Sequence, residues 1–141
     1  MGGGPVAPLL LDTHVWLWLV NGEPLHHAAT VAIRRASADS GLCICAISLW
    51  EVAMLEAKGR IQLQMDCLEW VAEACRRTAI RVVPLSAEIA VASTRLPGEL
   101  HGDPADRLIA ATARHEGAIL VTRDHSLLAY ARRGYLHAIE A

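Results

Sequence analysis

The sequence contains no phenylalanine, a single lysine and no excess of positive charge. All 13 basic residues except Lys58 are arginines, and the formal net charge is −2. A negative net charge excludes a generally basic nucleic-acid-coating protein, although the arginines can still form a local patch. No apolar run is long enough to cross a bilayer. Residues 1–4 (MGGG) lack the charge and the apolar stretch of a secretory signal, so we expect a cytoplasmic protein without a membrane partner.

Two further absences concern reactive side chains. The cysteines form no C-x-x-C pair, and no histidine stands at zinc-finger spacing from them. We expect buried structural thiols, because a free cysteine behaves as a small hydrophobic residue. These cysteines are Cys43, Cys45, Cys67 and Cys75. The sequence also has no G-x-S-x-G motif, so a hydrolase with a serine nucleophile lacks support.

The composition and the element pattern predict one α/β domain. Of the 141 residues, 53% are hydrophobic, which is typical of a packed globular chain. We expect a flexible start over residues 1–7 and a single domain over residues 8–141. Apolar runs predict strands at 8–12, 42–47, 80–85 and 118–121, with a short edge strand at 135–139. Helical patterns lie between them, at 13–20, 27–38, 49–58, 65–78, 86–96, 103–116 and 124–132.

This alternation indicates a mostly parallel sheet of four to five strands with helices on both faces. In such a sheet, strand ends and the starts of the following helices gather at one edge, where ligands bind. Asp12 ends the first strand, Glu51 lies in the first turn after the second, and Asp124 follows the fourth. These three carboxylates should therefore converge. Asp106 joins them only if its helix begins on the same edge.

Helix capping is the alternative explanation for most of these acids. Residues 48–51 (SLWE) match the S-x-x-E capping box, in which Glu51 would satisfy a backbone N–H. Asp103 reads as an N-cap with Asp106 three residues later, where acids suit the helix dipole. Asp124 could cap the last helix in the same way. Each acid taken singly is open to this explanation.

Asp12 is harder to explain by capping, because a carboxylate after three leucines is costly to desolvate without a partner. The set of four acids is harder still, since neighbouring carboxylates repel one another. A hard divalent cation would remove that cost. Carboxylate oxygens without thiolates suit Mg²⁺ or Mn²⁺.

Four motifs together carry a family resemblance. They are residues 9–14 (LLLDTH), 48–51 (SLWE), 103–113 (DPADRLIAATA) and 121–124 (VTRD). Their order and separations resemble the PIN domain, and most closely the VapC toxins of bacterial type II toxin–antitoxin systems. The resemblance covers the chain from about residue 8 to its end.

The resemblance implies a three-layer α/β/α fold and a metal-dependent endoribonuclease. Asp12, Glu51, Asp106 and Asp124 match the family's acidic quartet, and Asp12 and Asp106 match its most direct metal ligands. Thr122 matches a hydroxyl position beside the site. Asp103 matches an acid whose role is either capping or metal support. The resemblance also implies Mg²⁺ or Mn²⁺ as cofactor, RNA as substrate, a homodimer, and a cognate VapB-type antitoxin that blocks the site.

Several other side chains lie near the motifs. The candidates for RNA phosphate contacts are Lys58, Arg60, Arg107 and Arg123, with solvated helix ends as the alternative. His14 and His125 neighbour acids of the quartet and could support them, or could simply be surface residues. The histidines without ligand spacing to one another are His26, His27, His101, His115 and His137. The tryptophans Trp16, Trp18 and Trp50 are expected in the core, with a groove for an antitoxin helix or the dimer face as the alternatives.

Two alternatives remain from the sequence. A non-catalytic PIN-like module would bind RNA or protein without cutting, but it should lack one of the four acids. A receiver domain also carries acids at strand ends. That fold requires a phosphorylatable aspartate after the third strand and a late lysine, whereas residues 80–85 end in Pro-Leu before Ser86, and Lys58 is the only lysine.

Overall fold

A computed structural model describes residues 7–141 of the chain. Residues 1–6 lie outside the described part, and with them nearly all of the expected flexible start. The sheet consists of β1 (Leu9–Leu11), β2 (Leu42–Cys45), β3 (Arg81–Val83), β4 (Ile119–Thr122) and β5 (His137–Glu140). All neighbouring strands pair in parallel, in the order β3-β2-β1-β4-β5. The prediction of a parallel sheet that includes a short last strand is therefore confirmed.

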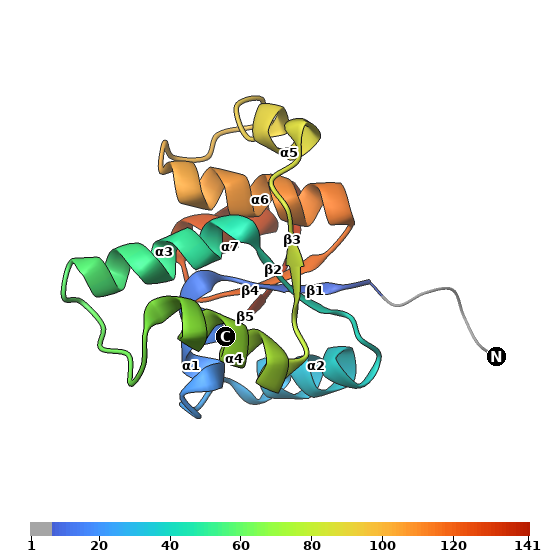
Figure 1. The fold of residues 1–141 in the computed structure, drawn as a ribbon. Helices are drawn as coiled ribbons and strands as arrows, with labels where there is room; N and C mark the ends of the chain where they lie inside the picture. Colours follow the sequence, from blue (N-terminus) through green and yellow to red (C-terminus); the bar gives the residue numbers. More distant parts are fainter. Residues whose placement is uncertain (1–6) are drawn as a thin grey trace.

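Seven helices cover the sheet within the described residues. They are α1 (Thr13–Val20), α2 (His27–Ala38), α3 (Ala46–Ala57), α4 (Cys67–Thr78), α5 (Ala87–Ala92), α6 (Pro104–Glu116) and α7 (His125–Arg132). Figure 1 shows α1, α2 and α4 on one face and α5, α6 and α7 on the other, which confirms the three-layer α/β/α fold. Among residues 7–141, no helix combines the length and the hydropathy needed to cross a membrane.

The strands are almost wholly apolar because both faces of the sheet are covered. Successive side chains point to opposite faces. Leu9 and Leu11 thus join the core beneath α1, α2 and α4, whereas Leu10 joins the core with α6 and α7. All three are buried, and each contributes about 1.5–3 kcal/mol of hydrophobic free energy. This central strand fixes the position of the acid that follows it.

The start of α3 differs from the prediction. Strand β2 ends at Cys45, and the helix begins at Ala46, three residues before the expected Leu49. Cys45 is the N-cap and makes no side-chain capping hydrogen bond. Ser48 therefore lies inside the helix, and the S-x-x-E capping box is wrong. Two other helix bounds also differ: α4 begins two residues late, and α5 ends at Ala92, four residues before the expected end, with Ser93 and Thr94 continuing only as a turn.

Candidate functional site

The four predicted acids meet in one pocket at the carboxyl ends of β1, β2 and β4. The pocket has a volume of about 400 Å³. It is lined by Asp12, His14, Val15, Trp18, Glu51, Asp103, Asp106, Arg123 and Asp124. The helix α6 therefore begins on the same edge of the sheet as α1, α3 and α7, and this geometry brings Asp106 to the other three acids.

The carboxylate of Asp12 is held by two residues, one in α1 and one in β4. Asp12 is the N-cap of α1, and its Oδ1 accepts a hydrogen bond from the backbone N–H of Thr13 at 2.8 Å. Its Oδ2 accepts a hydrogen bond from Thr122 Oγ1 at 2.6 Å. The same hydroxyl accepts one from the backbone N–H of Asp124 at 3.0 Å. Thr122 thus connects two acids of the pocket, at the position where the resemblance places a hydroxyl.

Glu51 is oriented by a chain of two hydroxyls. Thr13 Oγ1 lies 2.5 Å from Glu51 Oε1 and 2.8 Å from Ser48 Oγ. Because a hydroxyl carries one hydrogen, Ser48 donates to Thr13 when Thr13 donates to the carboxylate. Both hydroxyl residues are buried. Glu51 therefore faces the pocket from inside α3 and is not used as a cap.

Asp124 and Asp103 do act as caps. Asp124 accepts a hydrogen bond through Oδ2 from the backbone N–H of Leu127 at 2.9 Å, at the start of α7. Asp103 accepts hydrogen bonds through Oδ1 from the backbone N–H groups of Ala105 and Asp106, at 3.0 and 3.3 Å. The capping predicted for these two acids is present, and it leaves each with one carboxylate oxygen for other contacts.

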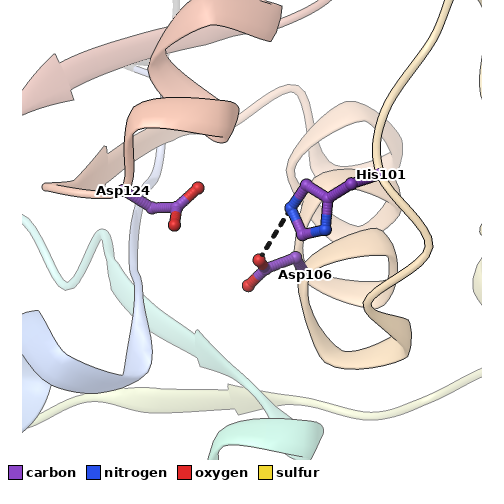
Figure 2. A group of neighbouring side chains, drawn as sticks. All are labelled: His101, Asp106 and Asp124. Atoms are coloured by element: carbon purple, nitrogen blue, oxygen red, sulfur yellow. Dashed lines mark ion pairs between the residues drawn. The ribbon is translucent and has the colours of Figure 1, made fainter.

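His101 joins the acids, although its sequence position gave no such indication. Its Nε2 lies 3.1 Å from Asp106 Oδ2, and Figure 2 shows the ring turned toward that carboxylate, with Asp124 across the pocket. Ligand atoms of His101, Asp106 and Asp124 all lie within 4.8 Å of one another. The only sequence signal was a histidine two residues before a helix N-cap, which no ligand-spacing rule covers.

The electrostatics of the pocket disfavour so many negative charges. Burial raises the pKa of Asp12 and of Glu51 above their usual range, although hydrogen bonds from Thr122 and Thr13 oppose this. Burial, followed by the charges of the neighbouring carboxylates, raises the pKa of Asp106 to about 7. A group of acids with raised pKa values is typical of a functional site. Without a cation, Asp106 is therefore partly protonated near neutral pH.

The predicted basic residues are distributed unevenly. Arg123 is exposed and lines the pocket, with its guanidinium carbon 4.2 Å from the centre of the Trp18 ring. The guanidinium of Arg107 donates to the backbone carbonyls of Ser93 and Leu100, at 2.9 and 2.8 Å. Lys58 and Arg60 are exposed after the end of α3 and do not line the pocket.

The remaining predicted aromatic residues divide between core and surface. Trp16 is fully buried and packs edge-on against Trp70, at a centroid distance of 5.2 Å. Trp50 is 57% exposed, so the core assignment fails for it. His14 lines the pocket and lies 6.1 Å from the Trp18 ring. His125 is exposed in the first turn of α7.

Of the cysteines, Cys43 and Cys45 are buried and Cys67 and Cys75 are partly exposed.

The donor atoms of the pocket fit a hard divalent cation. Five carboxylates line it, against one arginine among residues 7–141. Its lining includes no thiolate, and oxygen-only sites suit Mg²⁺ or Mn²⁺. Such a cation would neutralise the repulsion that raises the pKa of Asp106.

Comparisons with known proteins agree with this architecture. The profile of the PIN domain family matches residues 9–133. The chain is 38% identical to Ribonuclease VapC22 of Mycobacterium tuberculosis over 123 residues, which cover 86% of this chain and 91% of the relative.

Two solved structures share the fold. They are VapBC2 from Rickettsia felis bound to a DNA fragment from its promoter, and DNA-bound VapBC from Salmonella typhimurium. Each has a TM-score of 0.67 at 19% identity. The match covers 94% of this chain and 97% of the first structure's chain, and 96% and 98% for the second. With the family profile spanning most of its length and a VapC protein as a close relative, the chain belongs to the PIN domain family.

Proposed function

We propose that this protein is a metal-dependent endoribonuclease that acts as the toxin of a VapBC-type toxin–antitoxin pair. The observation that carries this proposal is the convergence of Asp12, Glu51, Asp106 and Asp124 in one pocket. Four separate segments contribute these acids, so helix capping alone does not account for their meeting. The name of the Mycobacterium tuberculosis relative, a ribonuclease, supports the same reaction.

In this proposal, Asp12 and Asp106 are the main ligands of Mg²⁺ or Mn²⁺, and Glu51 and Asp124 complete the acidic site. The bound cation would polarise the phosphodiester and lower the pKa of water. Thr122 and Thr13 keep Asp12 and Glu51 oriented toward the pocket through their hydrogen bonds. We expect hydrolysis to leave 5′-phosphate and 3′-hydroxyl ends.

Arg123 is the basic residue best placed to hold the RNA. It lies on the rim of the pocket, its Nε donates to the carbonyl of Ala141 at 2.9 Å, and its guanidinium stacks on Trp18, which leaves the terminal N–H groups for a phosphate. Lys58 and Arg60 would contact RNA only at a distance from the pocket. Arg107 already uses its guanidinium on backbone carbonyls, so we assign it a supporting role.

The proposed partners follow from the relatives. The two solved structures are DNA-bound VapBC complexes, and we infer a VapB-type antitoxin for this chain as well. We further expect a homodimer that works in the cytoplasm, where its RNA substrate lies.

The test is cleavage of total cellular RNA by the purified protein with Mg²⁺, with Mn²⁺ and with EDTA. We expect metal-dependent cuts at discrete positions, which Asp12→Ala and Asp106→Asn abolish while the circular dichroism spectrum is kept. Asp39→Asn is the matched control, because Asp39 is an exposed acid at the end of α2. Full activity of either site variant contradicts the site assignment. No cleavage of any RNA by folded, antitoxin-free protein would instead favour a non-catalytic binding module.

A further inference from the structure

His101 lies in the segment between α5 and α6, and both of its ring nitrogens have partners. Nδ1 accepts a hydrogen bond from the backbone N–H of Asp103 at 3.3 Å. Nε2 lies 3.1 Å from Asp106 Oδ2. Because the N–H of Asp103 uses the lone pair of Nδ1, the ring hydrogen is on Nε2. The hydrogen-bearing Nε2 therefore faces the carboxylate at 3.1 Å and has no lone pair to offer a cation.

This tautomer decides between two roles for the histidine. The distances among His101, Asp106 and Asp124 are compatible with three ligands of one metal ion. A histidine that ligates a metal through one nitrogen, however, almost always donates a hydrogen bond from the other. Here the other nitrogen accepts one. These contacts fit a histidine that does not bind the metal itself but holds the ligating carboxylate of Asp106 in place.

The segment before His101 is itself fixed by side chains of the two helices beneath it. Tyr130 donates to the carbonyl of Pro97, and Arg133 donates to the carbonyl of Glu99. Arg107 donates to the carbonyl of Leu100, the residue next to His101. Three carbonyls of residues 97–100 are thus held by α6 and α7. The backbone that carries His101 is therefore anchored by side-chain hydrogen bonds, which place the ring beside Asp106.

Gly98 shows how closely this segment is packed. Its φ is +67°, and an added Cβ would lie 2.4 Å from the ring of Tyr135. A side chain at this position would therefore strain the backbone and require the Tyr135 ring or the segment to move. Close packing of this kind keeps the position of His101 well defined.

We propose that His101 is a positioning residue of the metal centre, whose Nε2–H lies against Asp106 Oδ2 and directs that carboxylate toward the cation. The inference rests on the proposed metal site. The histidine leaves the ligand set all-oxygen, which preserves the preference for Mg²⁺ and Mn²⁺. Loss of such an outer partner typically lowers metal affinity by about 10–100-fold.

The test measures Mn²⁺ binding to the full chain by electron paramagnetic resonance, with the melting temperature in EDTA as the readout of the fold. We expect His101→Ala to lose about 10–100-fold in Mn²⁺ affinity with an unchanged melting temperature, because the ring is partly exposed. His101→Gln should regain most of the affinity, since its amide can place an N–H near the position of Nε2. His115→Ala is the control, an exposed histidine at the other end of α6.

Each other outcome has a distinct meaning. The positioning role is overturned if His101→Ala binds Mn²⁺ as tightly as the wild-type chain. It is also overturned if His101→Gln keeps the melting temperature but does not regain Mn²⁺ affinity. Electron-spin-echo spectra of Mn²⁺ with ¹⁵N-histidine protein overturn it as well if they show a directly coordinated nitrogen that is lost in His101→Ala and kept in His14→Ala, because His101 would then be a ligand. No Mn²⁺ binding to the wild-type chain overturns the metal site itself, and this inference with it.

Discussion

Thr122 donates a hydrogen bond to Asp12 across the sheet, with 2.6 Å between Oγ1 and Oδ2. Asp12 follows β1, and Thr122 is the last residue of the neighbouring parallel strand β4, whose pairing with β1 places Leu11 opposite Val121. The register of two apolar strands thus sets the distance between a hydroxyl and a carboxylate. The fully buried hydroxyl also accepts the N–H of Asp124, so it orients two acids of the pocket at once.

We predict that Thr122→Val lowers the affinity for Mn²⁺ or Mg²⁺ by about 10–100-fold. The substitution keeps the shape of the side chain and removes the hydroxyl, so Asp12 loses a hydrogen bond that favours its ionised form. Thr122→Ser is the matched control, because it keeps the hydroxyl and loses only a methyl group. Titration calorimetry with each metal measures the effect, and equal affinities in the two variants would contradict it.

The raised pKa of Asp106 predicts how the stability of the metal-free protein depends on pH. The folded state holds a proton up to about pH 7, whereas the unfolded chain releases it near the ordinary value of 3.8. The free energy of unfolding should therefore decrease as the pH rises from about 4 to about 7. Asp12 and Glu51 contribute in the same direction, because burial raises their pKa values as well.

Denaturant unfolding in EDTA across this pH window measures the decrease. Added Mg²⁺ should reduce it, since the cation binds the ionised carboxylates and stabilises only the folded state. Stability that rises with pH in EDTA would show that the acids are not held together in the metal-free pocket.

Asp106→Asn should make the metal-free protein more stable while abolishing cleavage. Above the pKa of about 7, this position carries a negative charge among like charges. Each unit of pKa elevation corresponds to about 1.4 kcal/mol, and solvent screening of a carboxylate that is not fully buried reduces the total, so we expect a gain of about 1–3 kcal/mol at a pH of about 8. Unfolding of both proteins in EDTA measures it, with Asp39→Asn as the exposed control. A loss of stability would mean that Asp106 is structural.

Parts of the site were predictable because they depend on local rules. A leucine run followed by Asp12 predicted a buried strand with an acid at its end, and Asp103-Pro104 predicted the start of α6. The start of α3 was missed because Cys45, without a capping side chain, is the N-cap. Its backbone turn depends on packing between layers, which local patterns do not encode.

His101 escaped prediction for a related reason. Its position depends on hydrogen bonds from Tyr130 and Arg133, which are distant in sequence and act on backbone carbonyls. No residue pattern around a histidine reports such contacts. The convergence of Asp106 with the other acids was likewise open until the edge at which α6 begins was known.

Arg107 and Arg123 both resemble RNA-contact residues in the sequence, and their contacts predict different phenotypes. Arg107→Gln removes two charge-assisted hydrogen bonds to Ser93 and Leu100. We expect it to destabilise the protein by about 1–3 kcal/mol and to weaken Mn²⁺ binding, because the segment before His101 loosens. RNA binding by this variant should keep the wild-type dependence on salt.

Arg123→Gln should do the opposite, because its guanidinium lies on the pocket rim over Trp18. We expect weaker RNA binding and a salt dependence with a slope reduced by about one, at unchanged Mn²⁺ affinity. Both variants are measured by RNA binding across a salt series in an Asp12→Ala background, in which the RNA stays intact, and by Mn²⁺ titration with Asp12 present. Equal salt slopes for Arg123→Gln and the parent would remove Arg123 from the RNA-binding surface. A reduced slope in Arg107→Gln would place that residue there instead.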